Sequence, residues 1–413
     1  MSMLRATAII IAISLICTFT QVSGQAKTTF AQAQGAYDRG AYGTAIKLLA
    51  KPASVEDFIL FGKLCAVTKV DGGVAAFADA IEADRGSTRT RSYYALGLID
   101  GHQLDKAMEQ VERGLRHDPQ SAELMSLKGR CLYKKGEARA GLELMEKAQQ
   151  RAPRSEIVLY DLARSYTESF DTAAADAAYT RLVKLKPGCV DPLLERAYMY
   201  VQAARDAQAL GDFAAILKIN PCCQLAYWQR AYFYQQRKKY REAIEDCKRC
   251  LACPDSIKQI ERRVLRLKID AQERLKLYAD AAADSKILTA ETPTLVKHWG
   301  VRGDMLRQAA LQEKLGQYKE ALATLDPLYK KAPDRTEVMV LRARILGKAG
   351  QYVSSLELCD KLITRDDSIP DWYRMRARAL KGLGRGADAE RDLRKAAALG
   401  DDIPDLPGFF HDK

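Results

Sequence analysis

The sequence is poor in the residues and motifs that most often build catalytic and metal sites. It has only four histidines, at positions 102, 117, 298 and 411, and none of them pairs with a cysteine or an acidic cluster at ligand spacing. It also lacks a glycine-rich phosphate loop and a nucleophile elbow. These absences predict that the protein is not an enzyme and that it holds no metal and no cofactor.

Long apolar runs are missing, with one exception near the N-terminus. There, Arg5 precedes an apolar stretch from Ala6 to Phe19, and the small residues of Val22-Ser23-Gly24 follow it. This three-part layout predicts a secretory signal over residues 1–24, because the stretch is shorter than the ~20 residues that span a bilayer. We therefore expect export to a periplasm, the extracellular space or a secretory lumen. An uncleaved membrane anchor is the alternative, and no second stretch is long and apolar enough to span a membrane.

The composition is that of a globular protein that favours acidic partners. The 413 residues are 47% apolar and 29% charged, with a formal net charge of +12. Two basic runs, at 237–239 and 330–331, are not interleaved with stacking aromatic residues. Nucleic acid is therefore not an expected partner.

One spacing repeats along the middle of the chain. Prolines, small residues and large residues each recur at intervals of thirty-four, at Pro119, Pro153, Pro187 and Pro221, at Gly129, Ala163, Ala197 and Ala231, and at Leu132, Tyr166, Tyr200 and Tyr234. A period of this length, in which each proline ends a helical pattern, is typical of stacked supersecondary units.

These columns resemble the tetratricopeptide repeat, a helix–turn–helix of thirty-four residues with small, large, aromatic and alanine positions in a fixed order. The stretch from Ala226 to Pro254 fits it well, with matching residues at Tyr227, Ala231, Tyr234, Tyr240 and Ala243. Later units continue the pattern, with matching residues at Gly316, Tyr318, Ala321, Ala343, Gly350, Tyr352, Ala377, Gly384 and Ala389.

The resemblance implies an all-α fold, a right-handed α-solenoid of about eleven helix pairs over residues 28–400. Residues 401–413 form a tail that docks as a cap or hangs free. The period lengthens over residues 256–315. We therefore expect extended first helices at Ser256–Lys276 and Thr294–Leu315, with Gly300 and Gly303 able to break the second.

The resemblance also implies a non-catalytic scaffold that binds a partner segment in a concave groove lined by the first helices. The residues expected to face the groove are Arg130, Tyr133, Lys134, Tyr160, Arg164, Leu194, Tyr198, Trp228, Tyr232, Gln235, Arg344, Lys348, Arg374, Arg378 and Lys381. Their aromatic centre and basic ends favour a protein or peptide segment that is acidic or amphipathic. A chaperone or assembly factor that binds unfolded clients is the alternative.

One subtype of the family is argued against. Its chaperone-binding members hold a terminal carboxylate with a clamp that uses asparagine, and Asn220, at a helix junction, is the only asparagine here. Pro221 follows it, so the chain has no N-glycosylation acceptor either.

Cysteines gather only around one helix pair. Cys222 and Cys223 precede its first helix, and Cys247, Cys250 and Cys253 recur along its second. Since the second helix runs back beside the first, a disulfide between Cys222 or Cys223 and Cys250 or Cys253 is one interpretation. A metal site and plain packing residues are the other two.

Overall fold

The computed structural model describes residues 29–84, 87–254, 256–290 and 299–400, and every regular element in these ranges is a helix. The all-α prediction is confirmed. The expected signal and tail lie outside the described ranges. No described helix combines the length and the apolar composition that a membrane crossing needs.

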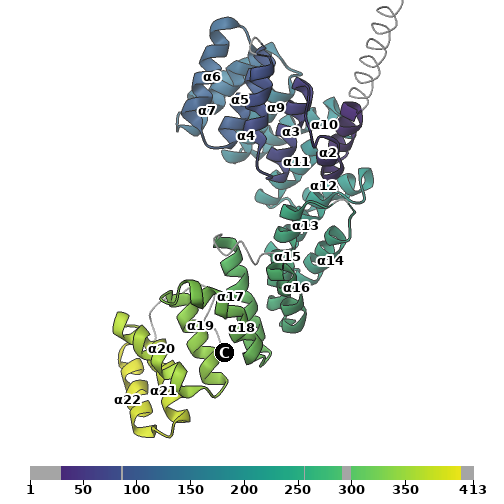
Figure 1. Ribbon diagram of the computed structural model, residues 1–413. Helices are drawn as coiled ribbons and strands as arrows, with labels where there is room; N and C mark the ends of the chain where they lie inside the picture. The colour runs from purple at the N-terminus through teal and green to yellow at the C-terminus, as the bar shows by residue number, and fades with distance from the viewer. Residues whose placement is uncertain (1–28, 85–86, 255, 291–298, 401–413) are drawn as a thin grey trace, which may run out of the picture. The chain divides into compact units, whose positions relative to one another are not determined.

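A helix over residues 29–38 comes first, and the remaining helices follow in chain order (Figure 1). They are α2 (Tyr42–Leu48), α3 (Val55–Thr68), α4 (Gly73–Ala83), α5 (Thr88–Asp100), α6 (Leu104–His117), α7 (Ala122–Lys134), α8 (Ala138–Arg151), α9 (Glu156–Glu168), α10 (Thr172–Leu185), α11 (Asp191–Gln202), α12 (Asp206–Ile219), α13 (Gln224–Gln236), α14 (Tyr240–Leu251), α15 (Lys258–Arg274), α16 (Tyr278–Ala290), α17 (Trp299–Lys314), α18 (Tyr318–Lys331), α19 (Thr336–Lys348), α20 (Tyr352–Arg365), α21 (Pro370–Gly382) and α22 (Gly386–Ala398).

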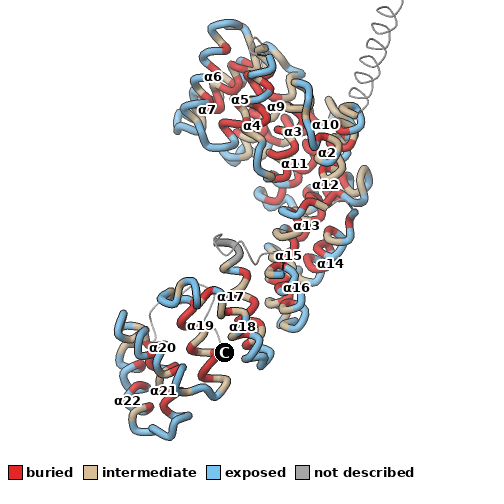
Figure 2. The backbone as a smooth tube through the Cα atoms, viewed as in Figure 1, coloured by how far each residue is buried: buried red, intermediate tan, exposed pale blue. Residues whose placement is uncertain are grey.

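The helices are arranged as consecutive pairs. The helix over residues 29–38 pairs with α2, and each later odd-numbered helix pairs with the even-numbered helix after it, which gives the eleven pairs expected from the sequence. First helices of successive pairs also contact each other, as α5 does α7 and α11 does α13. Each pair thereby buries apolar side chains against its neighbours, and Figure 2 shows buried stretches along the helices with exposed residues at the turns. The chain forms two compact units, Met1–Val264 (unit 1) and Leu265–Lys413 (unit 2).

Small residues allow the two helices of a pair to approach closely. A Cβ added to Gly129 of α7 would lie 2.6 Å from the carbonyl oxygen of Gly141 in α8, so only glycine fits there. The second pair, α3 and α4, has a weak repeat pattern and is packed around an aromatic ring instead. The ring of Phe77 in α4 fills the space that side chains at Gly62 and Gly97 would otherwise occupy.

The link between the helices of a pair passes through a left-handed residue. Glycine takes this position at Gly40, Gly136, Gly316, Gly350 and Gly384, but His102, Phe170, Ala204, Lys238 and Lys276 take it in other pairs with φ between 55° and 61°. Only glycine adopts this conformation without steric cost, so the non-glycine links store strain.

The two expected long helices are present over the described residues. Helix α15 has 17 residues and α17 has 16, against 12 or 13 in α7, α9, α11 and α13. The expected break at Gly300 and Gly303 is wrong, because α17 continues through both. A Cβ at Gly303 would meet no atom within 4 Å, so this glycine is simply tolerated within the helix. Residues 291–298 lie outside the described ranges.

In three of the helix pairs, the arginine that precedes the small residue of the first helix binds an aspartate of the second helix. Arg196 contacts Asp212, Arg230 contacts Asp246, and Arg376 contacts Asp392, each through two hydrogen bonds of 2.7 to 2.9 Å. Since these aspartates are buried, the bidentate arginine compensates a charge that burial would otherwise penalise.

In unit 1 the first pair lies against the sixth. Figure 1 shows α2 beside α11. Hydrogen bonds of the backbone and of side chains join the two segments. The Val190 amide donates to the Asp38 carbonyl at 2.8 Å, and the Tyr42 hydroxyl donates to the Asp191 carboxylate. We call this the closure contact. It joins segments about 150 residues apart, and the first helices of the intervening pairs therefore surround a common space.

Candidate functional site

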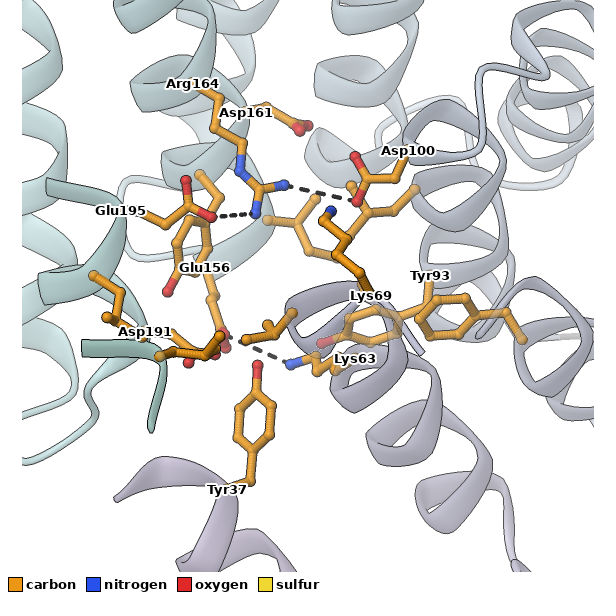
Figure 3. Close-up of a pocket in the computed structure, with 18 of the residues that line it drawn as sticks. Tyr37, Lys63, Lys69, Tyr93, Asp100, Glu156, Asp161, Arg164, Asp191 and Glu195 are labelled. Carbon is orange, nitrogen blue, oxygen red and sulfur yellow. Dashed lines mark hydrogen bonds and ion pairs between the residues drawn. The ribbon is translucent and has the colours of Figure 1, made fainter. Parts of the chain in front are cut away.

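A cavity of about 450 Å³ lies among the first helices of unit 1 (Figure 3). Tyr37 lines it from the helix over residues 29–38, and α3, α5, α7, α9, α11, α13 and the start of α15 supply the other walls. Its volume lies in the range of small-molecule pockets.

The structure brings several of the predicted groove residues together in this cavity. Arg130 of α7, Tyr160 and Arg164 of α9, Leu194 of α11 and Trp228 of α13 all line it. They come from two columns of the repeat, each with thirty-four residues between members. The period therefore predicted correctly which faces of these helices meet.

Tyr198 and Tyr232 continue the same two helix faces out of the cavity. Tyr198 follows Leu194 by one helical turn in α11, and Tyr232 follows Trp228 by one turn in α13. Their side chains are 49% and 46% exposed. We call this tyrosine pair the aromatic rim.

Two predicted groove residues of α7 lie elsewhere. Lys134 is bound to Glu168 at 2.7 Å and does not line the cavity. Tyr133 packs on the apolar cluster around Met145. Gln235 is half-buried near the end of α13 and is likewise outside the lining.

The remaining predicted residues belong to unit 2. The Glu313 carboxylate is contacted by Arg344 at 2.7 Å and by Lys348 at 3.2 Å. On α21, Arg374 is bound to Asp371, and the side chains of Arg378 and Lys381 are exposed.

Helix α3 and helix α5, which sequence reasoning left out of the groove, contribute Lys63, Lys69 and Tyr93 to the cavity. The Lys63 ammonium lies 4.8 Å from the centre of the Tyr93 ring and 3.6 Å from the Glu156 carboxylate. Weak repeat columns over residues 54–85 hid α3 from the register on which the groove prediction depends.

The acidic groups of the cavity are already engaged by the protein. Figure 3 shows Arg164 between two carboxylates, Glu195 at 2.9 Å and Asp100 at 3.8 Å. Although burial alone would raise it, the Arg164 guanidinium lowers the pKa of the Glu195 carboxyl. Glu156 is held in the same way by Lys63 and by Lys186, the latter at 2.5 Å.

Two aspartates of the cavity have no such close cation. Burial raises the pKa of Asp161 to about 6, against the attraction of Arg130, whose Nε lies 3.8 Å away. Burial likewise raises the pKa of Asp191 to about 6, and hydrogen bonds from Tyr37 and Tyr42 oppose the shift. Both carboxyls take up protons more easily than ordinary aspartates.

The cysteine group lies at the α13–α14 pair, and none of the described cysteines forms a disulfide in this structure. Burial, together with a contact from Cys222, raises the pKa of the Cys253 thiol to about 12, and burial raises the pKa of Cys223 to about 12. Cys250 donates to the Gln224 carbonyl at 3.4 Å. The hairpin brings both ends of the group together as expected, and the disulfide stays a prediction.

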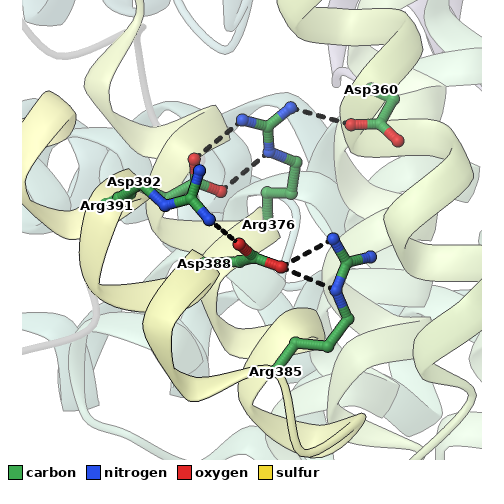
Figure 4. A network of polar contacts seen from close by, with 6 residues as sticks. All are labelled: Asp360, Arg376, Arg385, Asp388, Arg391 and Asp392. Carbon is green, nitrogen blue, oxygen red and sulfur yellow. Dashed lines mark hydrogen bonds and ion pairs between the residues drawn. The ribbon is translucent and has the colours of Figure 1, made fainter.

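No group of three or more possible metal ligands occurs among the residues that the structure describes. Unit 2 has a smaller hollow of about 240 Å³ at its last two pairs (Figure 4). There Arg376 binds Asp360 and Asp392, and Asp388 binds both Arg385 and Arg391. The three arginines thus neutralise the three aspartates, so this hollow has no charge in excess.

Comparisons with known proteins give matches at the level of the repeat. Models of the tetratricopeptide repeat match residues 95–156, 225–252 and 306–370. No curated protein matches the chain.

Several solved structures are similar at low identity. One is a structure of Naa15/Naa10 bound to HypK-THB, with 14% identity and a TM-score of 0.38 over 92% of this chain and 64% of that chain. A human IFIT1 dimer with PPP-AAAA has 14% identity and a TM-score of 0.40 over 86% and 76%. The APC/C hetero-tetramer Cut9-Hcn1 has 14% identity and a TM-score of 0.45 over 73% and 58%.

Proposed function

The chain belongs to the tetratricopeptide repeat family, and on that premise we propose that it is an exported scaffold that binds a protein partner along the aromatic rim of unit 1. Tetratricopeptide repeat proteins are generally non-catalytic interaction scaffolds. The partner segment in this proposal is extended and either acidic or amphipathic.

The observation that carries the proposal is the exposure of two equivalent tyrosines on neighbouring helices. Tyr198 and Tyr232 are 49% and 46% exposed, and their columns continue inward as the cavity-lining Leu194 and Trp228. Tyrosine is among the residues that contribute most to protein interfaces, because it offers a large contact area and few rotatable bonds.

The charge around the rim supports an acidic or amphipathic partner. The Arg263 guanidinium lies 5.7 Å from the centre of the Trp228 ring, one turn from Tyr232. The whole chain carries a formal net charge of +12. A positive field of this kind attracts acidic segments and rejects basic ones.

Site-specific photo-crosslinking in cells tests the proposal. A photo-reactive phenylalanine analogue would replace Tyr198, Tyr232 or Phe170 in separate variants. Phe170 is the control, because it is an aromatic residue of unit 1 that is 83% exposed and lies in the link between α9 and α10. We expect the same partner protein to be crosslinked from positions 198 and 232 and not from 170.

A peptide that spans the crosslinked segment would then be titrated against the purified chain. Since interface tyrosines often contribute about 2 kcal/mol, we expect Tyr198→Ala and Tyr232→Ala to weaken binding by at least about tenfold each. Phe170→Ala should leave the affinity unchanged. Equal affinity of all three variants, or equal crosslinking from all three positions, would exclude the aromatic rim as the binding surface.

Export is tested separately from binding. The signal interpretation predicts that the mature protein begins at Gln25, which N-terminal sequencing of the protein from an exported fraction measures directly. A protein that retains residues 1–24 and sediments with membranes would support the anchor alternative instead.

A further inference from the structure

Two cysteines of the α13–α14 pair lie where the chain enters α13 and where it leaves α14. Cys222 stands two residues before α13 and is exposed, and Cys253 stands two residues after the end of α14 and is buried. Because the two helices of a pair run antiparallel, both positions lie at the same end of the hairpin. Hydrogen bonds and side-chain contacts then decide which thiols of the cysteine group meet.

The Gln224 side chain holds the two ends of the hairpin together. Its Nε2 donates to the Cys250 carbonyl at 3.2 Å, and its Oε1 accepts from the Ile257 amide at 3.2 Å. Since Gln224 is buried, water does not compete for these hydrogen bonds. The segment that contains Cys253 is therefore fixed beside the start of α13.

Tyr227 lies close to both Cys253 and the residue that precedes Cys222. Its hydroxyl donates to the Pro221 carbonyl at 3.0 Å. Burial, and after it the nearby Cys253 thiol, raises the pKa of Tyr227. Cys222 follows Pro221 directly, and its side chain contacts the Cys253 thiol. Of the possible pairs between the two helices, Cys222 and Cys253 are thus already in contact.

The other thiols of the group are directed elsewhere. Cys223 is fully buried, and its Sγ would lie 3.0 Å from a Cβ added to Gly40, so it faces the closure contact. Cys250 is fully buried, and its thiol donates to a backbone carbonyl of α13 at 3.4 Å. Cys247 is fully buried within α14. A reagent in solution therefore meets Cys222 first, because it is the one exposed thiol among these five.

We propose that Cys222 and Cys253 form a disulfide by exchange with an external disulfide, and that this bond fastens the start of α13 to the end of α14. The Cys222 thiolate attacks the external disulfide, forms a mixed disulfide with one half of it and releases the other half as a thiolate. The Cys253 thiolate then attacks the Cys222 sulfur and releases the second half. The two protein thiols lose two protons and two electrons, and the reagent is reduced to two thiols.

Burial assigns the two steps to different thiols. Cys222 is exposed and can attack, whereas Cys253 is 7% exposed, so the sulfur it reaches is that of Cys222. Burial first, and then the contact with Cys222, raises the pKa of the Cys253 thiol to about 12. The second step is therefore the slower one. Once Cys222 is part of a mixed disulfide it no longer carries a thiolate charge, and its share of this shift disappears.

Peptide mapping of the purified full chain tests the pairing. The reduced chain is incubated with glutathione disulfide, unfolded, alkylated and digested with trypsin without reductant. Trypsin separates the cysteines at the two ends of the hairpin into peptides 219–230 and 250–258. We expect these two peptides to be joined. Tandem mass spectra should place the bond at Cys222 and Cys253, with the other cysteine of each peptide alkylated.

Variants separate the two steps of the reaction. Cys253→Ser cannot complete the second step, so we expect it to retain one glutathione on Cys222. Cys222→Ser should retain no glutathione on either peptide. Cys223→Ala and Cys250→Ala are the matched controls, because each removes a neighbouring buried thiol, and both should still form the bond. The map of the unchanged chain needs no variant, so the test stays valid if a control fails to fold.

The bond should also slow the local opening of this helix pair. It closes a loop of about thirty residues. Disulfides that close such loops typically stabilise enough to slow amide exchange about thirtyfold or more. Hydrogen exchange of the oxidised and the reduced chain should show this slowing in α13 and α14 and no change in α7 and α8.

Three outcomes would overturn the proposal. A bond at Cys223 or Cys250 would show that another pair reacts. Glutathione retained on Cys222 equally in the unchanged chain and in Cys253→Ser, or found on neither, would show that the two-step exchange does not occur. A bond that forms without slowing exchange in α13 and α14 would show that it does not fasten the pair. None of these results bears on crosslinking from the aromatic rim, so this proposal and the scaffold proposal fail separately.

Discussion

The closure contact of unit 1 depends on Gly40, and replacing this residue with alanine should open the contact. Gly40 has φ of +74°, and an added Cβ would lie 2.6 Å from Cγ2 of Val190 and 3.0 Å from Sγ of Cys223. Val190 is fully buried and cannot turn away easily, because β-branched side chains have few χ1 rotamers. Its amide is also held by the Asp38 carbonyl at 2.8 Å.

Two costs add in Gly40→Ala. A left-handed alanine costs about 1–2 kcal/mol, and overpacking a buried contact costs about 1–3 kcal/mol more. Gly136 is the matched control in the same unit, since its φ is +98° and an added Cβ would meet nothing within 4 Å. Gly136→Ala should therefore show the backbone cost alone.

Hydrogen exchange measured by mass spectrometry resolves where the stability is lost. In Gly40→Ala we expect exchange in α2 and the start of α11 to accelerate about a hundredfold, since each 1.4 kcal/mol is a factor of ten. In Gly136→Ala the effect should be smaller and should stay near the α7–α8 link. Adding Val190→Ala to Gly40→Ala removes the clashing methyl groups and should slow the exchange of α2 again. Equal effects of the two single variants, or no recovery in the double variant, would refute the steric explanation.

Three other predictions follow from the links, the cysteines and the buried acids. Ala204→Gly relieves a left-handed alanine, with φ of 55°, and should raise the free energy of unfolding by about 1 kcal/mol in a urea titration, whereas a loss would show that the link is unstrained. Of the described cysteines only Cys222 is exposed, so iodoacetamide should modify this one thiol among them in the native reduced protein. If the protein is modified only after treatment with a reductant, the result would support the disulfide interpretation. Burial raises the pKa of Asp161 and of Asp191 to about 6, so between about pH 6 and about pH 4 the folded state binds more protons than the unfolded state. As the pH falls through this window, the free energy of unfolding of unit 1 should rise by up to about 3 kcal/mol per carboxyl. Replacing both aspartates with asparagine should remove this rise.

The repeat pattern predicted local geometry better than long-range geometry. Columns at thirty-four-residue spacing assigned the pairs, and they placed Arg130, Tyr160, Arg164 and Trp228 on faces that do meet in the cavity. This prediction succeeded because each unit contacts mainly its neighbours, so a register that is correct for one unit is also correct for the units that follow it.

The closure contact could not be predicted in this way. It joins Tyr42 to Asp191, and no column of the repeat links positions so far apart. Their meeting depends on the small rotation between successive pairs, which accumulates over the array and is set by packing details such as Phe77 between Gly62 and Gly97. The cavity was hidden for the same reason, because without closure its walls would be an open groove.

The pair formed by Arg130 and Asp161 is a buried ion pair whose effect on stability can be predicted. Both groups are buried, their nearest atoms are 3.8 Å apart, and two guanidinium nitrogens lack hydrogen bonds, so the pair compensates little of its own desolvation. Replacing both groups by Arg130→Met with Asp161→Asn should leave the free energy of unfolding unchanged or raise it by about 1–4 kcal/mol, as with other buried ion pairs. The Asn side chain can still accept from Ser126.

This double variant should therefore be at least as stable as the original chain in a urea titration. A double variant that is clearly less stable would show instead that the pair is needed to hold α7 against α9. Arg130 would then be part of the packing between these two helices.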